Sequence, residues 1–465
     1  MIDYKKLGFK CGIEIHQQLE THKLFCSCPS IVHDENPSIE FKRKLRAVAG
    51  ETGEVDLAAA FEQNKDKIFI YEGCPTSSCM VEFDEEPPHE VNSEALDIVL
   101  EIALLLNCKI VDQIHFMRKT VVDGSNVSGF QRTAMVGVDG YVETSKGKVK
   151  ISSVCLEEEA AKKVKDYYRL DRLGVALVEI ATDPDIIDAE HAKETASILG
   201  MILRSTGKVK RGIGTIRQDV NVSIKGKSRV EVKGFQDLKS IPIVIDNEVK
   251  RQQKLSKSVP EVRKAETDGS TSFLRPMPGA ARMYPETDII PIEITASKLK
   301  TIELPELLTE KAMKLEKKFG LSADLANELV KDEIDLENYV KQFSKIEIKL
   351  LATILTSYPK ELKTRFDLDS SKLTKEHYKE ILSLLNKREI SKEAVIELMA
   401  DAASGKKIDP SKFKTVSDDS LKKELEMIVA KNKGAPLNAL MGEAMKHFRG
   451  KADGRKIMEI LKTLI

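Results

Sequence analysis

The apolar residues of this chain follow two different periods, and the change between them falls near residue 295. Before that point, several short runs alternate apolar and polar residues, which is the period of a half-buried β-strand. After it, segments rich in Lys, Glu and Leu carry apolar residues at helical spacing. The pattern predicts an α+β protein whose strands lie in the first part and whose second part is helical.

The main elements of the first part can be predicted from the same periods. Helices are expected at residues 93–107 and 189–206, the second of them ended by Gly207. Residues 225–228 are typical of the turn of an antiparallel hairpin. The expected strands are residues 11–19, 67–71, 148–156, 175–181, 215–224 and 229–234.

Three parts are expected along the chain. Residues 1–295 are predicted to form a mixed or antiparallel sheet domain, 296–410 a helical domain and 411–465 a small helical tail, with a break at residues 405–410. From residue 431 onward the tail carries eight basic residues against three acidic ones: Lys431, Lys433, Lys446, Arg449, Lys451, Arg455, Lys456 and Lys462 against Glu443, Asp453 and Glu459.

The charge totals exclude little by themselves. Lys+Arg and Asp+Glu are equal at 74 each, yet a basic face can exist within a neutral total, so nucleic-acid binding stays open. No long apolar run is present, and residues 1–6 are not followed by the apolar core of a signal peptide. We therefore expect a cytoplasmic protein that does not enter a membrane.

The first predicted strand places chemically active side chains on one face. Glu14, His16 and Gln18 occupy alternate positions, so they point the same way on a strand. A carboxylate beside an imidazole suits a divalent metal. The plain alternative is an ordinary solvated strand face.

The predicted hairpin repeats this arrangement. Arg217, Asp219 and Asn221 share a face on its first strand, and Glu231 and Lys233 share a face on its second. Together they make a two-stranded polar surface with both signs of charge. The water-facing side of an antiparallel sheet has the same pattern, so the pattern alone leaves both interpretations open.

Carboxylates also lie in or beside other predicted strands. Glu179 interrupts an otherwise apolar strand, where a buried carboxylate needs a metal or an arginine as partner. Residues 157–159 are three consecutive glutamates after a strand, an arrangement suited to holding magnesium between carboxylates and phosphates. An acidic helix start is the alternative for these three residues.

The seven cysteines, in a chain expected in the cytoplasm, fit reduced thiols or a metal site better than disulfides. Cys26, Cys28, Cys74 and Cys79 could supply four thiolates to a structural zinc ion. Their spacing lacks tight paired motifs, so buried or free thiols are the competing interpretation. The sequence contains no phosphate loop, no dinucleotide glycine fingerprint and no amide-hydrolase nucleophile motif.

Six segments together resemble one known family, the GatE and GatB components of glutamyl-tRNA(Gln) amidotransferases, nearly end to end. Residues 84–92 and 123–132 are closer to the archaeal GatE pattern than to the bacterial GatB pattern. The segments are residues 12–19 (GIEIHQQL), 84–92 (DEEPPHEVN), 118–133 (RKTVVDGSNVSGFQRT), 156–160 (LEEEA), 211–223 (RGIGTIRQDVNVS) and 275–288 (RPMPGAARMYPETD).

The resemblance implies a catalytic "cradle" domain with a kinase and transamidase site, followed by a helical domain and a tRNA-binding tail. It implies ATP and Mg²⁺ as cofactors, with Lys119, Arg217 and Asp219 near the nucleotide. It also implies a zinc segment at Cys26 and Cys28, with Cys79 as third ligand. The resemblance leaves the fourth ligand open, and Cys74 is the candidate that the sequence offers. The metal-binding and catalytic residues implied by the family pattern are Glu14, His16, Glu158, Glu179 and Glu231.

The same resemblance implies an enzyme that phosphorylates the glutamate on Glu-tRNA(Gln) and then amidates it. No glutaminase motif is present, so a partner is expected to supply ammonia. The resemblance implies that this partner is an asparaginase-like glutaminase, GatD, in a heterotetramer. Two alternatives stay open: a tRNA-binding protein without catalysis, and an enzyme that also acts on Asp-tRNA(Asn). The tail residues expected to bind tRNA are Lys446, Arg449, Lys451, Arg455 and Lys456.

One departure from the family pattern concerns residues 254–262. GatE proteins usually carry an inserted domain at this place that resembles part of aspartyl-tRNA synthetase. Here only a short loop is expected between the flanking segments. The tail is therefore expected to contribute a larger share of tRNA binding.

Overall fold

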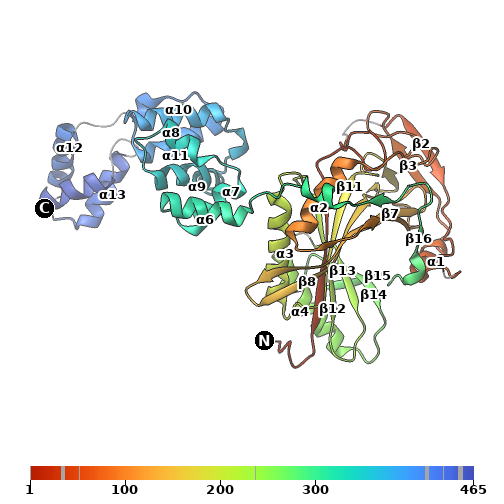
Figure 1. Ribbon diagram of the computed structural model, residues 1–465. Helices are drawn as coiled ribbons and strands as arrows, with labels where there is room; N and C mark the ends of the chain where they lie inside the picture. Colours follow the sequence, from red (N-terminus) through yellow and green to blue (C-terminus); the bar gives the residue numbers. More distant parts are fainter. Residues whose placement is uncertain are drawn as a thin grey trace. The chain divides into compact units, whose positions relative to one another are not determined.

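The computed structural model describes residues 2–32, 37–51, 53–235, 237–413, 418–432, 434–448 and 454–464. The chain divides into two compact units, Met1–Leu307 and Leu308–Ile465. Strands occur in the first unit, and the described elements of the second are helices (Figure 1). The α+β prediction is therefore confirmed, while the three-part division at residues 295 and 410 stays a prediction.

Eleven of the described strands of the first unit form one large mixed sheet, with the order β15-β14-β13-β12-β1-β11-β8-β7-β6-β16 and β4 paired to β7. Its central pairs are antiparallel, and β13 and β14 run parallel. Its strands are β1 (Lys10–Gln18), β4 (Lys109–Ile110), β6 (Phe116–Thr120), β7 (Phe130–Thr144), β8 (Gly147–Glu158), β11 (Ala176–Thr182), β12 (Ile216–Ser223), β13 (Val230–Lys233), β14 (Glu261–Ala265), β15 (Thr271–Pro276) and β16 (Met283–Pro285).

Two smaller sheets accompany the large one. Four strands pair in the order β2-β3-β10-β9, and β17 pairs with β5. Their bounds are β2 (Ile39–Arg43), β3 (Phe69–Gly73), β9 (Lys162–Val164), β10 (Tyr167–Arg169), β5 (Gln113–Ile114) and β17 (Ile292–Glu293).

One face of the large sheet is apolar and covered by helices. The helices α2 (Ser93–Leu105) and α3 (Ala189–Ser205) lie side by side against it, and α4 (Ser240–Lys254) packs on β12 (Figure 1). Ile13 and Ile15 of β1 and Val178 and Ile180 of β11 belong to this buried core. Since side chains alternate along a strand, the residues between them, including Glu14, His16 and Glu179, point to the opposite face. The short helices α1 (Leu57–Gln63) and α5 (Ala296–Lys300) complete this unit.

The described part of the second unit contains two separate apolar cores. The first includes residues from Leu321 to Ile408 and the second residues from Leu421 to Leu461. The helices of this unit are α6 (Leu308–Phe319), α7 (Ala323–Lys331), α8 (Leu336–Gln342), α9 (Ile348–Phe366), α10 (Lys375–Asn386), α11 (Lys392–Ala403), α12 (Asp418–Lys431), α13 (Leu437–His447) and α14 (Gly454–Leu464).

The elements expected in the first unit are present with small shifts at their ends. The hairpin turn at residues 225–228 joins β12 to β13, and Gly226 has a φ of +77°, which a side chain would disfavour. The sequence periods missed β7, although at 15 residues it is the longest described strand. Its glycines, Gly137 and Gly140, weaken the alternation, and the register shifts between Met135 and Gly137.

Candidate functional site

Three ligand-type side chains from three neighbouring strands meet on the polar face of the large sheet. His16 of β1 lies opposite Glu179 of β11, and its Nε2 is 3.1 Å from Glu179 Oε2 and 4.0 Å from Glu157 Oε2 of β8. These three residues, the His16 group, each offer a ligand atom within 4.8 Å of the others. A histidine with two carboxylates is a donor set that several divalent cations accept.

A lysine enters the His16 group from β6. Lys119 Nζ is 2.6 Å from Glu157 Oε1 and 3.4 Å from Glu179 Oε2. Burial raises the pKa of Glu179, but Lys119 and His16 outweigh it and hold this pKa well below the usual value. Burial lowers the pKa of His16, and the hydrogen bond and charge of Glu179 reverse that shift, so the net pKa is raised. Charge therefore concentrates in a largely buried place.

A second group, made of carboxylates, lies next to the first on the polar face of the large sheet. Glu14 of β1, Asp219 of β12 and Glu231 of β13, the Glu14 group, also offer ligand atoms within 4.8 Å of one another. Lys233 contacts Asp219 Oδ2 at 2.5 Å and also pairs with Glu231. The polar residues that the sequence placed on the β1 strand and on the hairpin thus come together.

The carboxylates of the Glu14 group are close together and largely buried, which disfavours their negative charges. Burial raises the pKa of Glu14, and the nearby charge of Glu231 raises it further. Asn221 donates a hydrogen bond from Nδ2 to Glu14 Oε1 at 2.9 Å, while its own Oδ1 is buried with no hydrogen-bond partner among the described residues. Three carboxylates and an unpaired amide oxygen are the hard oxygen donors that magnesium prefers.

A cleft of about 380 Å³ opens beside the two groups. This volume is within the usual range for a site that binds a small molecule. Its basic lining residues are Arg217, Lys233, Arg275 and Arg282, with His16 at the wall. Basic groups beside oxygen ligands for a cation suit a polyphosphate.

The predicted nucleotide residues lie at this cleft or at its edge. Arg217 Nη2 contacts Glu159 Oε1 at 2.8 Å, and both residues line the cleft. Asp219 also lines it, whereas Lys119 reaches the His16 group from β6, two strands away from β8. Arg282 donates from Nε to the Thr120 carbonyl at 3.1 Å.

Glu158 does not lie with these residues. It follows Val154 and Leu156 on the core-facing side of β8, where Arg132 donates its backbone N–H to Glu158 Oε1 at 2.8 Å. Arg132 Nε in turn contacts Glu286 Oε2 at 2.7 Å, so Glu158 belongs to a buried ion-pair chain. Of the two neighbouring glutamates, Glu157 therefore lies in the His16 group and Glu158 does not.

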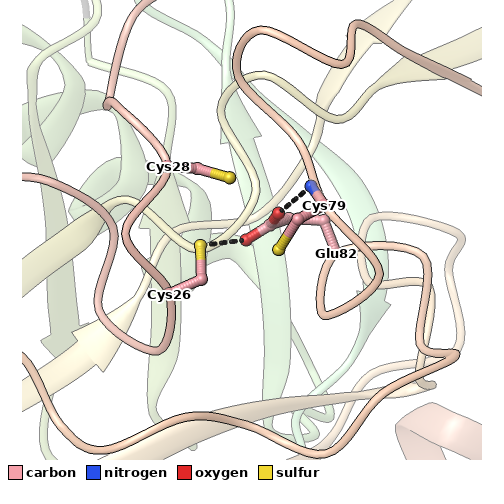
Figure 2. A group of neighbouring side chains, drawn as sticks. All are labelled: Cys26, Cys28, Cys79 and Glu82. Carbon is pink, nitrogen blue, oxygen red and sulfur yellow. Dashed lines mark hydrogen bonds between the residues drawn. The ribbon is translucent and has the colours of Figure 1, made fainter.

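A separate group of thiols lies near the start of the chain. Cys26, Cys28, Cys79 and Glu82 offer ligand atoms within 4.8 Å of one another, and Figure 2 shows their side chains converging. Glu82 accepts hydrogen bonds from Cys26 Sγ at 3.0 Å and from the Cys79 backbone N–H at 2.8 Å. Cys74, the expected fourth ligand, instead contacts Arg169 Nη2 at 3.8 Å and is not part of this group.

The thiol group is electrostatically strained. Burial, and after it the Glu82 carboxylate, raise the pKa of Cys79 to about 11. The same two causes, in the same order, raise the pKa of Cys26. The buried Lys23 lies 3.7 Å from Glu82 Oε1. Three thiols and a carboxylate within ligand reach are a donor set for tetrahedral zinc, which would favour the thiolates. All seven cysteines are free thiols.

The predicted tRNA-binding residues of the tail are only partly described. Lys446 is exposed on α13, and Lys456 is exposed on α14. Arg449 and Lys451 lie outside the described residues, as does the side chain of Arg455. None of the helices in the described part of the chain combines the length and apolarity that crossing a membrane requires.

Family models place this site within a known class of protein. The model described as the GatB/GatE catalytic domain matches residues 9–300, which include both carboxylate groups and the thiol group. A second model, described as the GatB domain, matches residues 335–465. The chain belongs to the GatB/GatE family.

Curated relatives narrow the class further, and three of them are named as the GatE component of glutamyl-tRNA(Gln) amidotransferase. The chain is 37% identical to the protein of Methanocaldococcus jannaschii over 623 residues, covering 99% of each chain. It is 36% identical to that of Methanococcus maripaludis over 622 residues (99% and 98%) and to that of Archaeoglobus fulgidus over 614 residues (100% and 99%). The chain is therefore an enzyme component of the amidotransferase class.

These alignments are also longer than the chain, which has 465 residues. The relatives must therefore carry segments with no counterpart here. The described chain passes directly from α4 to β14, which begins at Glu261.

Several residues of the site were not singled out from the sequence. Glu157 was named only as one of three consecutive glutamates, although alternation from Leu156 puts Glu157 on the polar face and Glu158 on the apolar one. Glu82 had none, since it lies in a loop three residues after Cys79. Arg275 and Arg282 reach the cleft from a distant part of the sequence, where no periodic pattern marks them.

Proposed function

We propose that this chain uses ATP to phosphorylate the glutamyl side chain of Glu-tRNA(Gln) and then replaces the phosphate by ammonia, giving Gln-tRNA(Gln). The observation that carries the proposal is the convergence of the His16 group and the Glu14 group beside a basic cleft. The names of the relatives supply the substrate.

The reaction needs activation because a carboxylate has no usable leaving group. In the first step a carboxylate oxygen of the glutamyl side chain bonds to the γ-phosphorus of ATP, and ADP leaves. In the second step the ammonia nitrogen bonds to the acyl carbon, phosphate leaves, and a proton is lost. Both steps depend mainly on positioning and on stabilising negative charge.

The chain's own residues divide this work. The His16 group and the Glu14 group would hold magnesium, with Glu157 in the role that the sequence assigned to Glu158. The chemistry that magnesium supplies when bound is to offset the negative charge of the phosphates and of the substrate carboxylate. Arg217, Arg275 and Arg282 are placed to bind phosphate oxygens across the cleft.

Ammonia must be delivered by another protein on this proposal. We assign that role to an asparaginase-like glutaminase, GatD, in a heterotetramer with this chain, because the sequence has no glutaminase motif. The tail would hold tRNA through phosphate contacts of Lys446, Arg449, Lys451, Arg455 and Lys456. Aminoacylated tRNA is a cytoplasmic substrate, so we place the enzyme in the cytoplasm.

Cys26, Cys28, Cys79 and Glu82 would hold a structural zinc ion beside this site. The chemistry that zinc supplies there when bound is to tie the loop around Cys26 to the loop around Cys79. Elemental analysis of the purified protein should find about one zinc per chain, because these four ligands complete one tetrahedral site. A Cys28→Ser variant should lose the metal, whereas Cys74→Ser, the matched control, should retain it.

The experiment that tests the function uses the purified chain alone. Given ATP, ammonium salt and Glu-tRNA(Gln), it should form Gln-tRNA(Gln), and glutamine in place of ammonium salt should give no product. Failure to hydrolyse ATP or form product with ammonium, while tRNA still binds, would favour a tRNA-binding protein without catalysis. Asp-tRNA(Asn) and uncharged tRNA in parallel reactions would define the substrate range.

A further inference from the structure

The two carboxylate groups of the cleft share a feature that the amidation chemistry does not explain. Each has one lysine ammonium among its carboxylates. Lys119 contacts Glu157 and Glu179 in the His16 group, and Lys233 contacts Asp219 and Glu231 in the Glu14 group. The lysines come from different strands, β6 and β13, so the arrangement is not a repeat along one element.

Two other buried carboxylates of the same unit are paired with arginine instead. Glu248 is held by Arg251 and by Arg263, and Glu286 by Arg118 and Arg132. Arginine offers a rigid fork of donors that makes a durable pair with a carboxylate, whereas the lysine ammonium is a compact point charge on a flexible stem. Glu248 and Glu286 thus have arginine partners. Each group beside the cleft has a lysine partner, as do the buried Glu82 and Glu101 elsewhere in the unit.

Each lysine ammonium contacts carboxylate oxygens that a divalent cation would also bind. Glu157 Oε1 is 2.6 Å from Lys119 Nζ, and Asp219 Oδ2 is 2.5 Å from Lys233 Nζ. A carboxylate has several lone pairs, but an oxygen paired with an ammonium has less negative charge to offer a metal. Two like charges within a few ångströms would also repel each other strongly in a largely buried place.

We propose that Lys119 and Lys233 compete with divalent cations for the His16 group and the Glu14 group, and that each ammonium leaves its carboxylates for a nucleotide phosphate when a cation binds. The proposal rests on the proposed function, since it takes both groups as cation sites. Lys233 lines the cleft itself, so its ammonium has a short path to a phosphate. Cation binding and phosphate binding would thereby be linked through two side chains.

The test measures equilibrium binding of Mn²⁺ to the full chain without nucleotide or tRNA, by electron paramagnetic resonance of free Mn²⁺. Lys119→Met and Lys233→Met should each bind Mn²⁺ about tenfold more tightly than the wild type, because a buried positive charge is removed. Lys233→Arg, which keeps the charge, should not. Lys146→Met is the matched control: it removes the same charge from a pair with Asp188 elsewhere in the unit.

A second measurement uses ATP with Mg²⁺. The two methionine variants should bind ATP more weakly than the wild type, because the displaced ammonium no longer reaches a phosphate. Tighter Mn²⁺ binding together with weaker ATP binding is a combination that a purely structural lysine would not produce. Circular dichroism of each variant checks that it folds, and the arginine variant tests Lys233 independently of any folding loss in the methionine variants.

The outcomes separate the two proposals. Unchanged or weaker Mn²⁺ binding in folded Lys119→Met and Lys233→Met would overturn the competition. The proposed function would stand in that case if the wild type still bound Mn²⁺. Absence of Mn²⁺ binding in the wild type and in every folded variant would overturn both, because neither group would then be a cation site. If Lys146→Met tightened Mn²⁺ binding as much, the cause would be the lower total positive charge of the chain. That result would also overturn the competition.

Discussion

The two units of this chain place their charged residues in opposite ways. In the first unit, Lys23, Glu157, Glu159 and Glu248 are at most 1% exposed, although burying a charge is costly. In the described part of the second unit, only Thr356 is both polar and buried, and the two interiors are otherwise apolar. Buried charge thus marks the unit that the GatB/GatE catalytic domain model matches, and apolar helix packing marks the other unit.

The largest effect expected from this comparison is on catalysis in the first unit. His16→Ala should lower Glu-tRNA-dependent ATP hydrolysis by roughly a hundredfold or more, the scale seen when a charge-stabilising group is removed from an active site. Binding of tRNA should change little. His115→Ala, an exposed histidine just after β5 that contacts Gln113, is the control. Near-normal turnover in His16→Ala would remove the His16 group from the mechanism.

The second effect is on the apolar interior of the helical unit. Leu382 is fully buried in α10, so Leu382→Ala should lower the free energy of unfolding by about 2–5 kcal/mol through lost burial and a cavity. Lys379→Ala, on the exposed side of the same helix, should change it by less than about 0.5 kcal/mol. Denaturant unfolding of the full chain measures both. Equal effects would mean that α10 is not packed as described.

A smaller effect is expected for the tail, where surface charge rather than packing should matter. Removal of residues 411–465 should weaken tRNA binding and flatten its salt dependence, by somewhat less than one unit of log–log slope for each lost phosphate contact. ATP chemistry on saturating tRNA should persist. Binding measured across a salt series, with circular dichroism of the shortened chain, tests this. An unchanged affinity and slope would place tRNA binding elsewhere.

The smallest effect concerns a buried histidine of the first unit. Burial lowers the pKa of His191, against the charges of Asp188 and Glu194, and its Nε2 lies 2.8 Å from Thr144 Oγ1. The unfolded chain therefore takes up a proton that the folded chain resists, so stability should fall as the pH drops below the unfolded value of about 6.5. His191→Gln should reduce this dependence by at most about 1.4 kcal/mol per pH unit. His447→Gln, at a side chain 58% exposed in α13, is the control.

Much of the fold followed from the sequence because periods of two and 3.6 residues report which face is buried. Alternation predicts β1, β12 and β13. The sequence predicts a metal or an arginine as partner of the isolated carboxylate Glu179, and the structure pairs it with His16 and Lys119. The contacts that complete the site are long-range: Lys119 reaches Glu157 from another strand, and Glu82 reaches Cys26 from a loop 56 residues away. Local patterns carry no information on such distances, so Cys74 was expected where Glu82 lies.

The central claim is that the chemistry takes place on the polar face of the large sheet, and two adjacent glutamates test it most directly. Glu157 points to that face, and Glu158 points to the core and pairs with Arg132. In Glu-tRNA-dependent ATP hydrolysis, Glu157→Gln should lose roughly a hundredfold or more, while folded Glu158→Gln should stay within about tenfold of the wild type. Full activity in Glu157→Gln together with an inactive, folded Glu158→Gln would contradict the account.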